Sequence, residues 1–531
     1  MPLLDWLNKD QAVKQVNQVP YRLLQPVPEL SFGDPNNENM LIQGDNLDAL
    51  KALLPLYAGK VKCIYIDPPY NTKSAFEHYD DNLEHSQWLS MMYPRLELLW
   101  ELLCPESGVI LISINDDEVH YLKVICDQIF GRSNFITSLV WNYEGNTDNQ
   151  AYITNYHEYI LVYAKSGNIE PTGVIDPNID MTSKLYKDEI RNTVVKNGPK
   201  NPVSSVTLPK GFPSSIEEGE IDITQIEWPK YQENLVIKDF ALQKETIASS
   251  GWASKKLLES FIDNNFEYVL DTKNQKTKFE ISSTGAIEGV KQREKDKGHF
   301  ISVLRGLGTT NQMRLLLSKL GIKFTYPKPV NLISYLIEAF SKDGDLVLDS
   351  FSGSGTTAHS VFGVNQRHRG NRKFIAIEMS EHNAERVIFP RLKEVIDGNS
   401  KAGLPGVDGG FYYYRLGEPI FDEYGCIRGD IRFAELAAHV WYLETRTPLL
   451  KKRRSPLLGV HNGIAYYLLY NGILGDRKPK GGNVLTGPIL SQLAKHDGPK
   501  VIFGETSRLG EARLKDEQIT FKQIPYDVRA R

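Results

Sequence analysis

The chain has 531 residues, a formal net charge of −4 at pH 7, and 41% hydrophobic residues. This length is too great for a single domain and predicts three or four. No apolar run is long enough to cross a membrane and the first residues lack a signal-peptide layout, so we expect a soluble cytoplasmic protein with no membrane contact. The four cysteines are scattered in apolar contexts, which is typical of reduced thiols and predicts neither a disulfide framework nor a metal site: Cys63, Cys104, Cys126 and Cys426.

The first informative motif follows a short arm. Residues 1–40 are expected to form this N-terminal arm, and residues 41–165 the first half of an α/β domain. An apolar run at 61–66 predicts a β-strand, and it ends on the quartet Asp67-Pro68-Pro69-Tyr70. Open α/β sheets bind their ligands at the carboxyl ends of strands, so this quartet is expected to line a ligand site.

The quartet combines an acid, a rigid carbonyl and an aromatic ring. The two prolines fix φ and lack N–H donors, so the carbonyls of this loop are available as acceptors. Asp67 and the Pro68 carbonyl could accept the two hydrogens of an exocyclic amine, while the ring that bears the amine stacks on Tyr70. The simpler alternative is a strand that ends at Pro69 and leaves a tyrosine on the surface.

The next segments continue the α/β pattern. Their spacing predicts an amphipathic helix over 87–103, a strand over 108–114 and a helix near 116–130. Between residues 166 and 323 this alternation breaks down, and six prolines fall between Pro171 and Pro213.

Basic residues in the second part of this insert are interleaved with aromatic ones, which suggests contact with a nucleic-acid backbone. Because the net charge is negative, such an attraction must come from local patches. The alternative is that most of these side chains are ordinary solvated charges. They are Lys255, Lys256, Lys273, Lys276, Lys278, Lys291, Arg293, Lys295, Lys297 and Arg305.

Residues 324–400 are expected to form the second half of the α/β domain. A short strand ends at Asp349 and runs into Ser350-Phe351-Ser352-Gly353-Ser354-Gly355-Thr356-Thr357, where the glycines allow a tight turn and close backbone approach before a helix. The next strand ends at Glu378, about 20 residues further on, where an acid typically accepts hydrogen bonds from a ribose. No lysine follows the second glycine as it does in a P-loop, so we expect a nucleoside cofactor without polyphosphate, which suits S-adenosylmethionine.

The order of the two motifs predicts a topology. In a doubly wound sheet of order 3-2-1-4-5, strands 1 and 4 are neighbours at the switch point. If Asp349 ends strand 1 and Asp67 ends strand 4, the two loops face one crevice. The chain is then a circular permutation that places the catalytic half before the cofactor half. Residues 401–531, after a glycine-rich linker at 403–410, are expected to form a C-terminal α+β region.

These motifs resemble those of amino-methylating DNA methyltransferases of the β group, and are most similar to the Mod (modification) subunits of type III restriction-modification systems. The extended quartet through Asn71 and Thr72 matches those subunits as well. The resemblance implies that Asp45 contacts the cofactor adenine and that Lys328, within Tyr326-Pro327-Lys328-Pro329, lines its methionine end. It also implies a prokaryotic protein whose insert at 166–323 is a target recognition domain.

The resemblance further implies double-stranded DNA as substrate, a homodimer formed through the C-terminal region, and a separate restriction subunit carrying any nuclease or helicase. The expected cofactor-binding residues are Asp45, Lys328, Asp349, Phe351, Gly353, Gly355, Thr356, Thr357 and Glu378. The expected catalytic residues are Asp67, Pro68, Pro69 and Tyr70.

The expected reaction is direct transfer of a methyl group to adenine N6 of a base flipped out of duplex DNA. Members that act on cytosine N4 usually begin the quartet with serine, so Asp67 favours adenine. Three alternatives remain: a cytosine-N4 methyltransferase, a catalytically silent DNA-binding assembly module, and a methyltransferase acting on RNA or protein. The intact motifs argue against the second, and the long insert and permuted order argue against the third.

Overall fold

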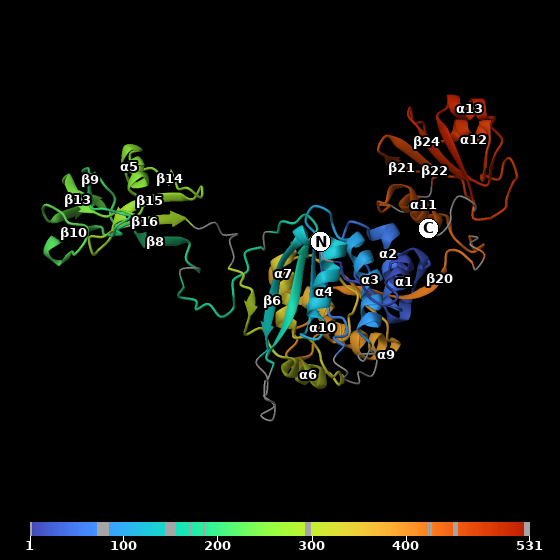
Figure 1. The fold of residues 1–531 in the computed structure, drawn as a ribbon, viewed down its shortest axis with the longest axis horizontal. Coiled ribbons are helices and arrows are strands. Elements are labelled where there is room, and N and C mark those ends of the chain that lie inside the picture. The colour runs from blue at the N-terminus through green and yellow to red at the C-terminus, as the bar shows by residue number, and fades with distance from the viewer. Residues whose placement is uncertain are drawn as a thin grey trace. The chain divides into compact units, whose positions relative to one another are not determined.

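A computed structural model describes residues 3–71, 84–143, 155–169, 172–183, 186–292, 299–422, 424, 427–449 and 455–524. The chain divides into two compact units: unit 1 comprises Met1–Thr172 and Phe300–Arg531, and unit 2 comprises Gly173–His299 (Figure 1). Unit 2 is therefore contained in the predicted insert of 166–323 but is shorter at both ends. No helix within the described ranges is both long and apolar enough to cross a bilayer.

Unit 1 is built on one mixed β-sheet. Its strands lie in the spatial order β1-β20-β3-β19-β18-β4-β5-β7-β6-β17, and the six strands from β20 to β5 run parallel to one another. Strand β7 runs antiparallel between β5 and β6. The strands are β1 (Arg22–Pro26), β3 (Met40–Gln43), β4 (Cys63–Ile66), β5 (Val109–Ile114), β6 (Phe135–Asn142), β7 (His157–Ala164), β17 (Val303–Leu304), β18 (Leu346–Asp349), β19 (Lys373–Glu378) and β20 (Gly410–Pro419).

The central strands are buried on both faces, as parallel strands covered by helices usually are. Ile64 of β4 and Ile110 of β5 belong to one core together with Leu50 and Leu99, which lie on the helices α2 (Asn46–Tyr57) and α3 (His85–Leu102). Residues of the opposite parity point to the other face. There Phe374 of β19 contacts Phe362 of helix α8 edge to face.

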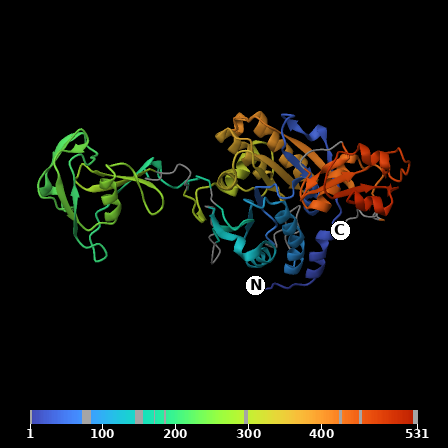
Figure 2. The ribbon, with the colours of Figure 1, turned by 90° about the horizontal axis from the view of Figure 1, so that it is seen from above.

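Further helices complete unit 1. In chain order they are α1 (Lys9–Gln18), α4 (Val119–Cys126), α6 (Thr310–Lys319), α7 (Val330–Phe340), α8 (Thr356–His368), α9 (Glu381–Asn383), α10 (Phe389–Asp397), α11 (Phe433–Thr445), α12 (Gly487–Gln492) and α13 (Glu511–Asp516) (Figure 1 and Figure 2). One-turn π-helical segments follow α4 at Asp127–Gly131 and α9 at Ala384–Ile388. The C-terminal part adds a smaller sheet of order β21-β22-β24-β26, from Leu457–His461, Ile464–Leu468, Lys500–Gly504 and Ile519–Gln523.

The two ends of the predicted α/β domain differ from expectation. Within the predicted arm, β1 pairs antiparallel with β20, so residues of the arm extend the central sheet. Strand β20 lies inside the predicted C-terminal region, yet it pairs in parallel with β3. Its run Phe411-Tyr412-Tyr413-Tyr414 is apolar and aromatic, and two of these rings are buried against the sheet edge. The glycines before it mark a turn into this strand.

Unit 2 has its own apolar core, which includes Phe212, Phe261, Phe279 and Trp252. Its largest sheet has the order β14-β15-β16-β8, from Val269–Leu270, Lys276–Ile281, Ile287–Gln292 and Glu189–Thr193. Helix α5 (Lys255–Asp263) packs its buried face, Leu258 and Phe261, into this core. Smaller sheets pair β9 (Ser204–Leu208) with β13 (Thr246–Ser250), and β10, β11 and β12 (Glu218–Ile221, Leu235–Lys238, Ala241–Leu242) with one another.

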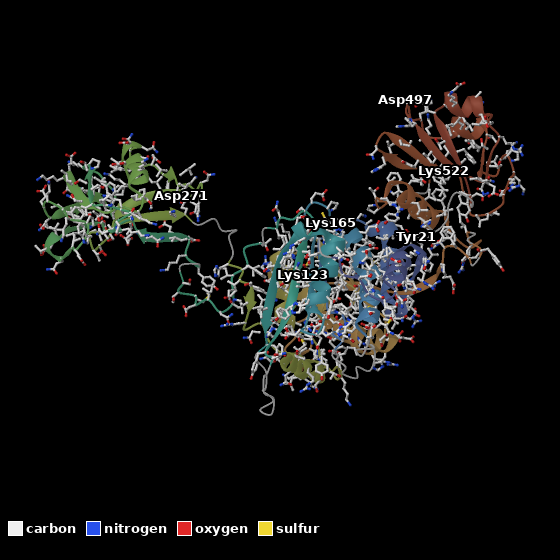
Figure 3. The ribbon with its side chains drawn as sticks, viewed as in Figure 1. Tyr21, Lys123, Lys165, Asp271, Asp497 and Lys522 are labelled. Atoms are coloured by element: carbon white, nitrogen blue, oxygen red, sulfur yellow. The ribbon has the colours of Figure 1, made fainter. Side chains whose placement is uncertain are left out.

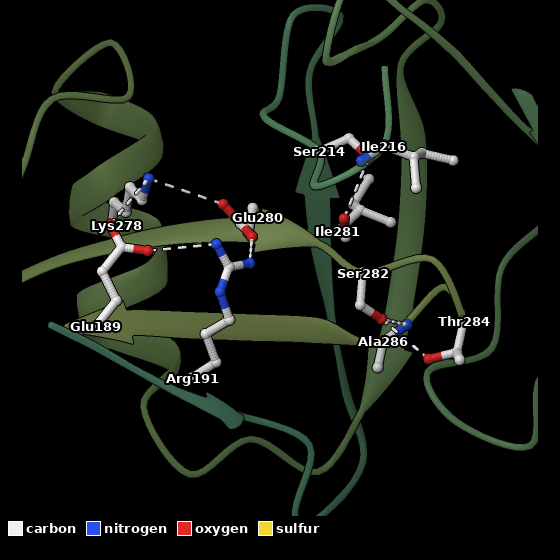
Figure 4. Close-up of polar contacts among 10 residues, drawn as sticks. All are labelled: Glu189, Arg191, Ser214, Ile216, Lys278, Glu280, Ile281, Ser282, Thr284 and Ala286. Atoms are coloured by element: carbon white, nitrogen blue, oxygen red, sulfur yellow. Dashed lines mark hydrogen bonds and ion pairs between the residues drawn. The ribbon is translucent and has the colours of Figure 1, made fainter. Parts of the chain in front are cut away.

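Several basic residues of unit 2 are paired with acids of the same unit. Arg191 forms an ion pair with the buried Glu280, and its guanidinium also lies 3.3 Å from Glu189 (Figure 4). The ammonium of Lys278 lies between the same two acids, 3.8 Å from Glu189 and 3.9 Å from Glu280. These four charges neutralise one another, so this face offers little attraction for a polyanion.

A second pair in unit 2 joins Lys291 to Asp271 at 2.5 Å. Asp271 is labelled in Figure 3. The lysine's hydrogen bond lowers the pKa of Asp271 to about 2. Among the basic residues predicted to contact a nucleic acid, those without an ion pair to any described residue of unit 2 include Lys256, Lys273 and Lys276. Arg293, Lys295 and Lys297 lie outside the described residues, as do Thr72 and Cys426.

Candidate active site

The two predicted motifs lie side by side. Strand β18, which ends at Asp349, pairs in parallel with β4, which ends one residue before Asp67. Because both are parallel neighbours, their carboxyl ends meet at the same edge of the sheet. A cavity of about 500 Å³ opens there. It is lined by Tyr65, Asp67, Pro68, Pro69, Tyr70, Glu158, Thr310, Lys323, Phe324, Thr325, Tyr326, Lys328, Asp349, Phe351, Ser352, Gly353, Ser354, Thr356, Thr357, His382 and Asn383.

The loop after β18 is folded around the Asp349 carboxylate. One carboxylate oxygen accepts the Phe351 N–H at 2.9 Å, and the other accepts the Thr357 hydroxyl at 2.5 Å. Burial raises the pKa of Asp349 to about 7, although these two hydrogen bonds oppose the shift, and the nearby Asp67 adds to it. A cation placed in the cavity would therefore favour the ionised form of this buried acid.

Gly353 lines the cavity at the turn of this loop. It adopts a left-handed conformation with φ +51°, and its N–H donates to Glu378 at 2.8 Å. The other carboxylate oxygen of Glu378 accepts the Ser380 N–H at 2.9 Å. The fully buried Glu378 therefore holds the loop against the end of β19, and it does not line the cavity. Its predicted contact with a ribose remains a prediction.

Gly355 packs against the protein's own helical segment, and its predicted contact with the cofactor remains a prediction. It is also left-handed, with φ +78°, and it is the N-cap residue of α8. A Cβ at this position would lie 2.9 Å from a methyl of Ile388, on the side of the π-helical segment. The close approach that requires glycine here is therefore to the protein's own helix, and Gly355 is absent from the cavity lining.

The buried Arg391 braces the same loop. Its Nη1 donates to the Ser354 carbonyl at 2.8 Å, and to the Ser354 and Thr356 hydroxyls at 3.0 Å each. The Thr356 hydroxyl in turn donates to the Lys328 carbonyl at 3.1 Å. Burial lowers the pKa of Arg391 to about 9. Through these contacts, the glycine loop and the segment that carries Lys328 are held at one relative position.

Asp67 belongs to a compact polar cluster with Tyr70, Glu158 and Lys328. The Lys328 ammonium lies 2.9 Å from Asp67 Oδ1, 3.2 Å from Glu158 Oε2 and 2.9 Å from the Tyr70 hydroxyl oxygen. The Tyr70 hydroxyl lies 2.7 Å from the same Asp67 oxygen and 3.0 Å from the same Glu158 oxygen. Lys328, expected at the methionine end of the cofactor, is thus joined to the quartet itself.

This cluster fixes the charge states of its members. Burial disfavours the ammonium of Lys328, but the charges of Asp67 and Glu158 outweigh that effect and raise its pKa above the ordinary value. Burial, and then the same two carboxylates, raise the pKa of Tyr70 well above the ordinary value. Lysine is therefore a cation here and tyrosine a neutral hydroxyl.

The rest of the quartet is held from the protein side. Trp88 Nε1 of α3 donates to the Pro69 carbonyl at 2.8 Å. Pro68 lines the cavity, and no hydrogen bond from a described residue reaches its carbonyl. Asn71, with φ +60°, donates to the buried Glu118 at 2.7 Å, and Glu118 also contacts His85. This arrangement leaves Pro68 as the carbonyl that can accept from a ligand.

Asp45 is the N-cap residue of α2. Its Oδ1 caps α2 by accepting the Leu47 N–H at 2.8 Å, and its Oδ2 lies 3.2 Å from Arg95. The same arginine donates to Asn46, whose side chain donates to the Ser350 carbonyl at 2.9 Å. Asp45 does not line the cavity, so its predicted contact with an adenine remains a prediction.

Glu158 is the main residue that the sequence did not single out. It lies on β7, a strand whose other residues from Ile160 to Ala164 are buried and apolar. A charged residue beside such a run was the available signal, but the register that turns it toward the cavity comes from the pairing of β7 with β5 and β6. Phe324, His382 and Asn383 were likewise not expected in the lining.

Residues 61–389 match the protein family described as DNA methylase. The Mod subunit of the type III restriction-modification enzyme EcoPI of Escherichia phage P1 is 34% identical over 420 residues, which cover 71% of this chain and 63% of that subunit. The EcoP15I Mod subunit of Escherichia coli is 29% identical over 472 residues, or 78% of this chain and 71% of that subunit. Among solved structures, the PvuII DNA methyltransferase (cytosine-N4-specific) matches with 13% identity and a TM-score of 0.33, over 67% of this chain and 86% of that one.

The match to the family covers more than half of the chain and contains both motif loops. The predicted resemblance to Mod subunits is confirmed over most of the chain, which spans 63% of the length of the EcoPI subunit. This chain belongs to the DNA methylase family.

Proposed function

We propose that this protein transfers a methyl group from S-adenosylmethionine to adenine N6 in duplex DNA, as the modification component of a restriction-modification system. The observation that carries the proposal is the pairing of β4 with β18, which brings Asp67 and Pro68 into one cavity with the Asp349 loop. The Asp67 loop is suited to bind an exocyclic amine, and the Asp349 loop is suited to bind a nucleoside.

The cavity fits S-adenosylmethionine in size and charge. Its volume of about 500 Å³ lies within the range of small-molecule sites. Its lining contains three acids, Asp67, Asp349 and Glu158, and two lysines, Lys328 and Lys323, and this balance favours a cation and disfavours a polyphosphate. Phe324 and Phe351 add apolar surface for the cofactor's carbon skeleton. When bound, S-adenosylmethionine supplies an electrophilic methyl group on a sulfonium.

On the base side, Asp67 and the Pro68 carbonyl accept the two hydrogens of the amine. This draws the nitrogen toward tetrahedral geometry and makes its lone pair available for in-line displacement. As the nitrogen–carbon bond forms and the sulfur–carbon bond breaks, the nitrogen loses a proton to Asp67. The base must leave the duplex to reach this cavity, and we propose that it stacks on the Tyr70 ring.

The wider organisation is proposed as well. The neighbouring β18 and β4 support the strand order of a circularly permuted methyltransferase, with the catalytic half first in the chain. Unit 2 is proposed to read the DNA sequence, a homodimer to form through the C-terminal region, and a separate restriction subunit to supply cleavage. The EcoPI and EcoP15I relatives are named as Mod subunits of type III enzymes, which supports this assignment.

The proposal is tested by mapping methylated bases in DNA from cells that express the protein, and by Asp67→Ala. We expect N6-methyladenine at one fixed sequence, and loss of methyl transfer by about 10²–10⁴-fold or more in Asp67→Ala, because the proton acceptor is lost. Cofactor binding, followed by calorimetry, should remain. Asp397→Ala, on the exposed end of α10, is the matched control. N4-methylcytosine as the product would refute adenine, and full turnover in Asp67→Ala would refute the mechanism.

A further inference from the structure

We infer that Glu158 is a positioning residue of the methyl-transfer site, which balances the Lys328 ammonium so that Asp67 remains an anionic acceptor for the base amine. The inference rests on the proposed function and adds a third charged group to it. Glu158 enters the cavity from β7, a strand that belongs to neither motif.

The geometry is a shared cation between two carboxylates. Asp67 Oδ1 and Glu158 Oε2 face the same two donors, the Lys328 ammonium and the Tyr70 hydroxyl, at distances between 2.7 and 3.2 Å. The Tyr70 hydroxyl has a single hydrogen and can serve only one carboxylate at a time. Lys328, with three hydrogens, is the group that joins all members of the cluster.

This arrangement leaves one oxygen of Asp67 for the substrate. Among the described residues, every contact to Asp67 reaches Oδ1, and no hydrogen bond reaches Oδ2. Oδ2 can therefore accept the amine hydrogen while Oδ1 stays anchored to Lys328. All four side chains of the cluster line the cavity, and those of Lys328, Glu158 and Asp67 are only 11%, 20% and 24% exposed, so solvent screens these charges weakly.

The charge count explains why a second acid is needed. Two carboxylates and one ammonium give the cluster a net charge of −1, which favours the positive charge that develops on the amine nitrogen and the transfer of its proton to Asp67. Without Glu158, Lys328 would neutralise Asp67 alone, and the site would be a net neutral and poorer acceptor. With Glu158 present, Lys328 can hold Asp67 Oδ1 in place while the cluster keeps its net charge of −1.

The kinetic test uses Glu158→Gln, Glu158→Asp, Lys328→Met and the double variant Glu158→Gln/Lys328→Met. Glu158→Gln should lower kcat by roughly tenfold or more, with little change in KM for the cofactor. This loss should be smaller than the loss of about 10²–10⁴-fold that is expected when the proton acceptor itself is removed. Glu158→Asp should retain more activity, because it keeps the charge. The double variant should lose little activity beyond that lost in Lys328→Met alone, because Glu158 acts through the charge of Lys328. Tyr159→Phe, on the opposite face of β7, is the matched control.

A second readout does not require activity. The titratable groups around the Lys328 ammonium are Asp67 and Tyr70 after β4, Glu158 on β7 and Tyr143 after β6. In Glu158→Gln, one of the two stabilising carboxylates is gone, so Lys328 should react with an amine-modifying reagent at lower pH than in the unmodified protein. Mass spectrometry of the Lys328 peptide measures this shift, with folding checked by circular dichroism.

The outcomes separate the inference from the proposed function. If the unmodified protein methylates no DNA, the proposed function fails, whereas the labelling shift still tests the coupling of Glu158 to Lys328. If the labelling profile of Lys328 is unchanged in Glu158→Gln, or Glu158→Gln lowers kcat as much in the Lys328→Met background as in the unmodified protein, the balancing role of Glu158 is overturned. A labelling shift together with a smaller loss of kcat in the Lys328→Met background supports it.

Discussion

At the scale of the residue, Asp349 gives the clearest pH dependence. Burial raises its pKa from an ordinary 3.8 to about 7. Between these two pH values the folded protein holds a proton that the unfolded chain releases. The free energy of unfolding therefore decreases as the pH rises from 3.8 to about 7. A bound sulfonium favours the carboxylate and lowers the same pKa. Cofactor binding should therefore release a proton at about pH 6, and affinity should rise until about pH 7.

Calorimetry in two buffers of different ionisation enthalpy measures this proton release. In Asp349→Asn the release should disappear. Equal binding enthalpies in both buffers for the unmodified protein would contradict the expectation and show that Asp349 is already ionised before the cofactor binds.

Single residues also show where sequence reasoning reached its limit. The quartet, Phe351 and Gly353 line the cavity as expected, because a motif on one continuous segment carries its local geometry with it. The partners of Lys328 could not be expected, since Glu158 is 170 positions away in the chain and meets it only through the sheet order. Asp45 is an N-cap, a role that short acids before a helix fill for purely local reasons.

At the scale of the element, two glycines allow the cost of backbone strain to be separated from the cost of overpacking. Gly355 and Gly344 share φ +78°, but a Cβ at Gly344 meets nothing within 4 Å, while one at Gly355 lies 2.9 Å from Ile388. Gly344→Ala should lower the free energy of unfolding by about 1–2 kcal/mol, the cost of the left-handed conformation. Gly355→Ala should cost about 1–3 kcal/mol more, because overpacking is added.

Urea unfolding of both variants and the unmodified protein provides the measurement. Equal losses in the two variants would mean that the π-helical segment carrying Ile388 yields without cost. A cofactor-binding defect in Gly355→Ala with unchanged stability would return Gly355 to the role of direct cofactor contact.

The elements themselves were predictable where the hydrophobic pattern was strong and local. The predicted helix at 87–103 overlaps α3, and the strands predicted to end at Asp349 and Glu378 coincide with β18 and β19. Strand β20 was read as part of a separate region, because its place beside β3 depends on a pairing between segments far apart in the chain. The π-helical segments were not foreseen either, since their sequences differ little from those of ordinary helices.

At the scale of the whole molecule, the insert is smaller than its sequence suggested. The segment from Phe300 to Lys323 belongs to unit 1. Strand β17 pairs with β6, Thr310 and Lys323 line the cavity, and Met313 of α6 packs in one core with Val387. A chain that leaves unit 1 after Thr172 and returns at Phe300 therefore adds unit 2 without interrupting the cavity.

This organisation predicts two different results for two exchanges with the insert of a relative. An exchange of residues 173–299 should leave cofactor binding unchanged and alter only the DNA sequence that is methylated, because the chemistry stays in unit 1 and the proposed recognition moves with unit 2. An exchange of residues 166–323 should abolish cofactor binding, because it also replaces Thr310, Lys323 and the α6 packing.

Calorimetry with S-adenosylmethionine and methylation mapping measure the two effects. If the narrow exchange left the methylated sequence unaltered, recognition would have to be sought in unit 1, and if both exchanges bound the cofactor equally well, the segment 300–323 would have no part in the site.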